Sequence, residues 1–126
     1  SGIETLIVTP VGTPPSDGRK LRRTASRGNR WDVYNTRLGF ELQREAVRVS
    51  GARDRGVKHR HGLYLLRQAP CPAALIEMGF ISNGKEAARL ADPGHQARAA
   101  AGVVNGIIRY HWALWRSAKA DRKAGN

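Results

Sequence analysis

The sequence predicts an α/β fold in which a layered sheet carries helices on both faces. Short β-branched and apolar runs alternate with longer segments in which apolar residues recur every three or four positions. A length of 126 residues suits one domain with a real core. Hydrophobic residues make up 40% and charged residues 25%, which is a typical globular balance.

Strands are expected at residues 3–9, 62–67 and 73–78. The last two are nearly continuous apolar runs, as expected of interior strands that are covered on both faces. Residues 10–30 are rich in proline, glycine and basic residues, which indicates either a solvated connection or a basic loop that faces the substrate. The basic segment 52–62 is expected to be a loop.

Helices are expected at residues 31–50, 83–90 and 94–115. Asn29 is the expected cap of the first and Gly51 its end, Asn83 caps the second, and Asp92 followed by Pro93 starts the third. The apolar stripe of the first helix is Trp31, Tyr34, Leu38, Leu42, Ala46 and Val49. The apolar face of the third is Ala97, Ala100, Ala101, Val104, Ile107, Ile108, His111 and Trp115.

The composition indicates an anionic partner. Lys and Arg number 22 against 10 acidic residues, for a formal charge of +12, which attracts nucleic acid, acidic wall polymers or anionic lipid surfaces. The single cysteine, Cys71, excludes an internal disulfide and a cysteine zinc knuckle. No apolar run is long enough to cross a membrane. Because the chain opens within a strand and without Met, we expect it to be the later part of a longer protein.

Glu77 is the leading candidate for chemistry. It closes the apolar run 73–78, and ligand sites of open α/β sheets form at the carboxyl ends of strands. Burial there raises the pKa of a glutamate towards neutrality, which suits general acid–base catalysis. The simpler alternative is that Glu77 ends the strand and pairs with Arg67 or Lys58.

An ordered series of motifs resembles a known family. The segments "GIETLIVTP", "NRWDVYNTRLGFELQREAV" and "RGVK…LYLLR…PAALIEMGFISN", followed by "QARAAAGVVNGIIRYHW", are similar to the later part of a zinc-dependent N-acetylmuramoyl-L-alanine amidase of the amidase_3 type. The resemblance covers about residues 1–112. It implies that residues 1–115 are the C-terminal portion of an amidase catalytic domain, with 116–126 a basic flexible tail.

The resemblance also implies a reaction. In the family a zinc ion activates a water that attacks the amide between N-acetylmuramic acid and the L-alanine of the stem peptide. Zinc lowers the pKa of its bound water to about 7. The glutamate of the "E-x-G-F-x-S-N" motif acts beside the metal, and here that position is Glu77. The implied enzyme is a peptidoglycan hydrolase that works in the periplasm or outside the cell.

The family's zinc ligands have no counterpart in this sequence. They lie in a "D-P-G-H-G-G" loop, a following glutamate and an "S-x-H-x-N" strand end, all of which would precede residue 1. The segment "ADPGHQ" at 91–96 follows Glu77 and lacks the glycines, so Asp92 is expected to be a helix cap and His95 a first-turn residue. His59 and His61 lack a third ligand. We therefore assign no metal ligand to this chain, expect the zinc ligands upstream, and expect the chain alone to be inactive.

Four further residues match the family's pattern. Glu4 is expected either to orient a metal ligand or to form an ion pair, and Asn35 to reach the rim of the active site. Arg55 and Lys58 are expected either to bind stem-peptide carboxylates or to be solvated. Glu86, in the first turn of the helix after Glu77, is expected to tolerate replacement by glutamine.

Two other functions compete with the amidase. One is a cell-wall-binding module of the same fold without catalysis, which the charge of +12 and its attraction to anionic wall polymers favour. The other is nucleic-acid binding. Since the basic residues are scattered and no recognition motif or stacking platform is evident, no specific nucleic-acid partner is expected.

Overall fold

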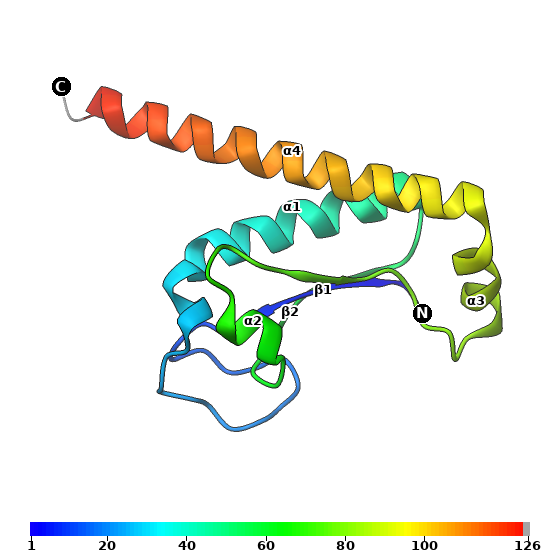
Figure 1. The fold of residues 1–126 in the computed structure, drawn as a ribbon, viewed down its shortest axis with the longest axis horizontal. Coiled ribbons are helices and arrows are strands. Elements are labelled where there is room, and N and C mark those ends of the chain that lie inside the picture. Colours follow the sequence, from blue (N-terminus) through cyan, green and yellow to red (C-terminus); the bar gives the residue numbers. More distant parts are fainter. Residues whose placement is uncertain (125–126) are drawn as a thin grey trace.

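The sheet is built around β1 (Ile3–Val8), whose six residues are all buried. Its apolar, β-branched side chains suit a strand that is covered on both faces. It lies between β2 (Asp54–Arg60), which runs parallel to it, and β3 (Leu75–Glu77), which runs antiparallel (Figure 1). The computed structural model describes residues 1–124.

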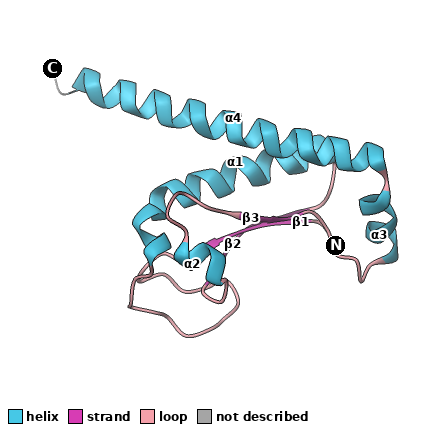
Figure 2. Cartoon of the chain, in the orientation of Figure 1, coloured by secondary structure: helices cyan, strands magenta, loops and turns pink. Residues whose placement is uncertain are grey.

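Helices cover both faces of this sheet, as the sequence predicts. The long helix α1 (Asp32–Ser50) lies on one face, and α4 (Pro93–Ala124) packs on the outer side of α1. The single-turn helix α2 (Tyr64–Gln68) lies on the opposite face, where Leu66 packs with Leu6 and Val8 (Figure 2). Helix α3 (Gly84–Ala91) joins β3 to α4, and a 3-10 turn, η1 (Arg27–Trp31), precedes α1.

Helix α1 has the predicted extent but buries two faces instead of one stripe. Gln43 bonds to Thr5 in the sheet, while Ala46 lies beneath α4. Tyr34, expected in the stripe, is 43% exposed. A helix that lies between a sheet and a second helix must bury both of its sides. One apolar stripe in the sequence predicts only one buried side. Gly51 ends α1 as predicted, with a left-handed φ of 66°.

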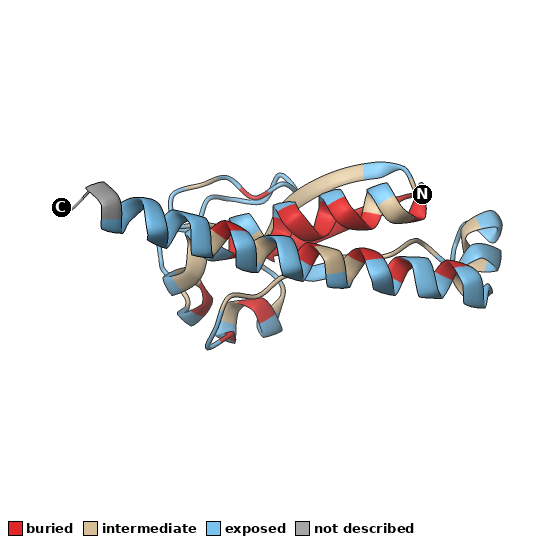
Figure 3. Cartoon of the chain, turned by 90° about the horizontal axis from the view of Figure 1, so that it is seen from above, coloured by how far each residue is buried: buried red, intermediate tan, exposed pale blue. Residues whose placement is uncertain are grey.

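The predicted apolar face of α4 points away from the core. Its packing face consists of small residues instead: a Cβ on Gly102 would lie 2.8 Å from the Cα of Ala46, and one on Gly106 would lie 2.8 Å from the Cα of Leu42. Because glycine allows the two backbones to come this close, larger residues are excluded from the contact. They face outward, and much of the surface of α4 is exposed (Figure 3). His111, expected in the core, is exposed as well.

Two predictions of local structure were wrong. Residues 62–67 were expected to form a strand, but α2 occupies most of that run, with Leu66 buried and Leu65 74% exposed. Residues 52–62 were expected to form a loop, but they contain β2, which pairs with β1 from Ile3↔Asp54 to Val8↔Arg60. A short apolar run does not distinguish helix from strand, and a charged segment becomes a strand when a buried partner strand is available.

Other segments agree with the prediction in part. The strand expected at 73–78 is found at Leu75–Glu77, but it lies at the edge of the described sheet instead of in its interior. Asn83 and Asp92 cap α3 and α4 as predicted, whereas Asn29 lies in η1 and bonds to the backbone oxygen of Thr9. Helix α4 continues to Ala124 through most of the expected tail, whose last residues, 125–126, lie outside the described part. None of the helices within residues 1–124 is both long and apolar enough to cross a membrane.

Candidate active site

The alternation of side chains along β1 divides the candidate residues between two faces. Thr5 and Ile7 face α1, where they lie against Gly39. Glu4 and Leu6 therefore point to the other face. Glu77 lies directly opposite Glu4 in the β1–β3 register and shares that face. Glu77 thus stands on the side of the sheet that α1 does not cover.

Glu77 borders two neighbouring hollows of about 370 and 450 Å3. Its residue is half-buried, and among residues 1–124 no ion pair or hydrogen bond involves its side chain. The alternative pairing with Arg67 or Lys58 is therefore not found. The first hollow is lined by Leu6, Asp17, Arg19, Arg60, Gly62, Leu63 and Glu77. The second is lined by Glu77, Gly79, Phe80, Ile81 and Ser82.

Glu4, the neighbour of Glu77, is held by a basic residue. Its carboxylate accepts a hydrogen bond of 2.8 Å from Nε of Arg55, and it is 5% exposed. The same guanidinium lies 4.8 Å from the centre of the Phe80 ring. Arg55 therefore links β2, β1 and the turn after β3, and its cation is already occupied by protein groups.

Lys58 and Asn35 occupy different environments. Lys58 pairs with Leu6 in the β1–β2 register, so it lies on the Glu77 face, and no ion pair to it occurs within the described residues. Asn35 is 2% exposed. Its amide donates to the oxygen of Gly28 at 3.1 Å and accepts from the nitrogen of Ala73 at 2.8 Å. Asn35 was expected at the rim of the site, but both ends of its amide bind backbone, so it joins α1 to the segment before β3.

The loop of residues 10–30 contributes to the first hollow. Ser16 is fixed to His59 by two hydrogen bonds, one from its own nitrogen to the oxygen of His59 at 3.0 Å and one from the nitrogen of His59 to its hydroxyl at 2.8 Å. This attachment places Asp17 and Arg19 on the wall that they share with Glu77. The contact supports the substrate-facing interpretation of the loop, and no sequence pattern identified these two residues.

Glu86, expected to tolerate replacement by glutamine, makes two hydrogen bonds to the backbone. One of its carboxylate oxygens accepts from the backbone nitrogen of Gly2, and the other accepts from that of Phe80 at 2.9 Å. Burial raises the pKa of Glu86, but the backbone hydrogen bonds from Phe80 and Gly2, together with nearby positive charges, hold that pKa below its usual value. Glu86 therefore fixes the turn that follows Glu77. The local signal was its place at the third position of a helix capped by Asn83.

The part of the chain that the structure describes contains no zinc site of its own. Among residues 1–124 no group of three His, Cys, Asp or Glu side chains converges. A catalytic zinc usually has three protein ligands. His95 is buried in the first turn of α4 and lines a small hollow with Met78 and Glu86, not the two hollows that Glu77 borders. Burial, followed by the charge of Arg22, lowers the pKa of His61.

Comparisons with known proteins agree with this arrangement. The chain is 38% identical over 76 residues to the germination-specific N-acetylmuramoyl-L-alanine amidase of Bacillus subtilis (strain 168), a match that covers 60% of this chain and 32% of that protein. The LytC amidase of the same organism is 31% identical over 75 residues, covering 60% of this chain and 15% of LytC.

Solved structures show the same fold. The CwlD amidase of Clostridioides difficile, solved in complex with the GerS lipoprotein, superposes with a TM-score of 0.66 at 28% identity, covering 89% of this chain and 47% of that one. An N-acetylmuramoyl-L-alanine amidase from Clostridium difficile 630 gives 0.64 at 28% identity, with 86% and 47% covered. The chain thus spans about half the length of these structures. Residues 1–109 match the amidase_3 family, described as N-acetylmuramoyl-L-alanine amidase, and the chain belongs to that family.

Proposed function

We propose that this chain is the C-terminal part of a catalytic domain that hydrolyses peptidoglycan at the amide between N-acetylmuramic acid and L-alanine. The observation that carries the proposal is the position of Glu77 and its lack of an ion pair in the described residues. Glu77 lies within the region that matches the family, on the face of the sheet that α1 does not cover, bordering two hollows and without a cationic partner in the described residues.

The chemistry assigns Glu77 to proton transfer. As the base, it takes a proton from the water that attacks the amide carbon. As the acid, it delivers that proton to the nitrogen of L-alanine when the C–N bond breaks. A paired arginine would stabilise the ionised form and make Glu77 a weaker base. The absence of such a partner beside Glu77, next to a Glu4 that has one, fits this assignment.

The proposed enzyme needs zinc, and its zinc ligands are proposed to lie in a part of the protein that precedes these residues. Members of the family are generally zinc-dependent, and the described residues do not supply three ligands. We therefore place the ligands in the preceding part of the protein, and no step is assigned to the metal here. Because peptidoglycan lies outside the cytoplasmic membrane, the site of action is the periplasm or the cell wall.

The other candidate residues take supporting roles. Lys58, on the Glu77 face and free of ion pairs in the described chain, is assigned to the carboxylates of the stem peptide. Arg55 is assigned to holding Glu4 and Phe80 beside Glu77, and Asn35 to holding the segment before β3.

The test is Glu77→Gln in a protein that includes the preceding half. General acid–base groups contribute about 100- to 10,000-fold, so the rate constant for release of L-alanine amino groups from peptidoglycan should fall at least about 100-fold. Zinc content should not change. Asp121→Asn is the matched control, since it makes the same chemical change on the exposed far part of α4. Loss of zinc in Glu77→Gln, or near-full activity, would overturn the assignment.

A non-catalytic wall-binding protein is the second candidate, favoured by the lack of a three-ligand site in residues 1–124. The same assay separates the two. If the protein with its preceding half binds peptidoglycan, releases no amino groups and contains no zinc, the binding function stands and the amidase is rejected.

A further inference from the structure

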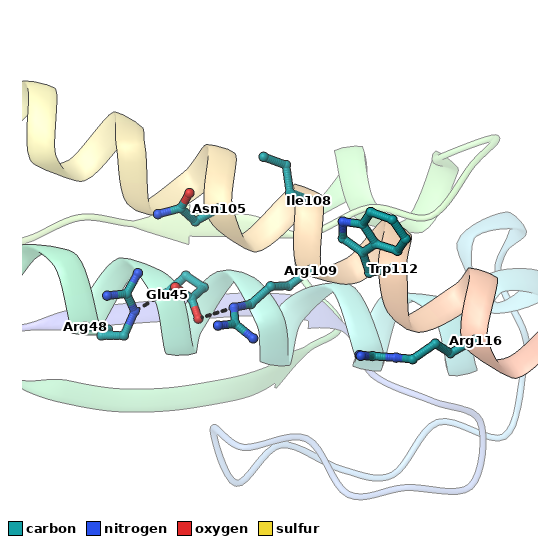
Figure 4. A pocket seen from close by; sticks show the side chains of 7 residues that line it. All are labelled: Glu45, Arg48, Asn105, Ile108, Arg109, Trp112 and Arg116. Atoms are coloured by element: carbon teal, nitrogen blue, oxygen red, sulfur yellow. Dashed lines mark hydrogen bonds and ion pairs between the residues drawn. The ribbon is translucent and has the colours of Figure 1, made fainter.

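A second hollow of about 350 Å3 lies between α1 and α4, on the opposite side of α1 from the sheet. We call it the α1–α4 cleft. It falls in the size range of small-ligand sites. Its walls are Glu45 and Arg48 of α1, with Asn105, Ile108, Arg109, Trp112 and Arg116 of α4 (Figure 4).

The cleft carries an excess of positive charge in a fixed arrangement. Glu45 is 1% exposed, and it binds Nε of Arg48 and Nε of Arg109, each at 2.8 Å (Figure 4). Both guanidinium groups thus contact Glu45 through Nε. Their terminal nitrogens make no hydrogen bond within the described residues and remain donors for a ligand. Arg116, which also lines the cleft, has no ion pair within the described residues, so the cleft wall carries three guanidinium groups and one carboxylate.

An aromatic wall stands beside these cations. Trp112 is 53% exposed and makes an edge-to-face contact with Trp115, with ring centroids 5.6 Å apart. Lys119 lies 4.8 Å from the centre of the Trp115 ring. The contact with Trp115 orients the Trp112 ring while leaving much of it open. An exposed indole beside cations suits a ligand with an apolar sugar face and an anionic substituent.

We propose that the α1–α4 cleft binds a carboxylated glycan, namely the peptide-free strand that the amidase reaction leaves behind. This inference rests on the proposed function. Hydrolysis of the amide puts oxygen from water on the carbonyl carbon, so each N-acetylmuramic acid keeps a free lactyl carboxylate while the peptide leaves as an amine. The carboxylate is bound by Arg116 and the terminal nitrogens of Arg109, and the sugar ring lies on Trp112. The cleft and Glu77 are on opposite sides of α1, so a bound product strand does not block the site.

A glycan fits the cleft better than a nucleic acid does. Single-stranded nucleic acid is bound by successive aromatic rings that stack on bases, along a basic groove. The two indoles of α4 are perpendicular at 87°, so they do not offer two parallel platforms. A peptide-free glycan strand needs less: one aromatic ring for the sugar face and one cationic cluster for the carboxylate of each bound sugar.

The experiment measures binding of the protein that includes the preceding half to peptide-free glycan strands by calorimetry. Chito-oligosaccharides of the same length are the comparison ligand, because they share the sugar backbone and lack the lactyl carboxylate. We expect binding of the carboxylated strands, weakening as salt rises, and at least tenfold weaker binding of the neutral ones. Arg116→Ala and Trp112→Ala should each weaken binding about five- to tenfold, and Arg116→Lys should weaken it less.

Controls separate the cleft from general charge and from catalysis. Arg98→Ala removes the same charge from α4 about 27 Å away along the helix and should leave binding unchanged. The peptide-free strand contains no scissile amide, so its binding is measured without catalysis, and failure of the amidase proposal would leave this result intact. Equal binding of chito-oligosaccharides, tighter binding of poly(glycerol phosphate) or single-stranded DNA, or an equal effect of Arg98→Ala would each overturn the proposal.

Discussion

The carboxylates between α1 and α4 differ from Glu77, which lies on the face of the sheet away from α1, in how many arginines they bind. Towards α4, Glu41 and Glu45 are 2% and 1% exposed, and each is held by arginines: Glu41 by Arg37 at 2.9 Å and Arg44 at 2.6 Å, and Glu45 by Arg48 and Arg109. On the far face of the sheet, Glu77 has no such partner in the described chain. An acid bound by several cations stabilises the fold, whereas a carboxylate without such partners is available for contact with a substrate. Four substitutions test this contrast.

The largest loss of stability is expected where α4 meets α1. Gly106→Ala places a Cβ 2.8 Å from the Cα of Leu42, and overpacking costs about 1–3 kcal/mol. Gly84→Ala is the matched control, because its added Cβ meets nothing within 4 Å. Alanine is the better helix former, so the control should be neutral or more stable. Urea unfolding measures both, and equal midpoints would show that the helices do not pack this closely.

Glu45→Gln is expected to cost about 1–2 kcal/mol at pH 7, because it weakens the charge-assisted hydrogen bond from Arg48 and the ion pair with Arg109, and both arginines are partly solvated. Burial raises the pKa of Glu45, but the hydrogen bond from Arg48 and the charges of Arg109, Arg48 and Arg44 together lower it.

This lowered pKa fixes the sign of the pH dependence. The stabilisation by Glu45 is complete above the unfolded-state pKa of about 4.3 and is lost as pH falls through the lower folded-state pKa. The difference between Glu45→Gln and the parent should therefore shrink below about pH 4. A constant difference from pH 7 to pH 3 would contradict the ion-pair account.

Arg55→Lys should cost about 1 kcal/mol, since an ammonium reproduces neither the Nε hydrogen bond to Glu4 nor the guanidinium stacking on Phe80. Hydrogen exchange at the backbone amide of Phe80 is the local measurement, and its protection should fall. Arg53→Lys, on the neighbouring exposed residue, is the control. If both variants leave the Phe80 amide protected, Arg55 does not hold the turn.

The smallest effect on stability is expected at the proposed catalytic acid. Glu77→Gln removes no ion pair or hydrogen bond seen in the described residues, so unfolding free energy should change by less than about 0.5 kcal/mol. The comparison with Glu45→Gln therefore contrasts a carboxylate that stabilises the fold with one that does not. A loss at Glu77 as large as that at Glu45 would make Glu77 a structural acid.

Local sequence signals determined much of this protein. The order of motifs indicated the family, and β-branched residues 3–9 and the three- and four-residue periodicity of 31–50 located β1 and α1. Gly51, Asn83 and Asp92 marked helix ends because a cap depends only on nearby backbone groups. Glu77 was singled out for the same reason, from its place at the end of a short strand.

Tertiary packing decided what no local pattern contains. Segment 54–60 becomes β2 because β1 offers it a buried partner, and the run at 64–68 becomes α2 because only Leu66 needs to reach the core. Gly102 and Gly106, and not the apolar face of α4, form its contact with α1, because glycine lets the two helix backbones approach more closely than large side chains could. That apolar face is exposed in this chain, which spans about half the length of the solved amidases. The same packing gathers Arg48, Arg109 and Trp112, far apart in sequence, into one cleft. Contacts between distant segments depend on distances and orientations in three dimensions, and these exist only once the chain has folded.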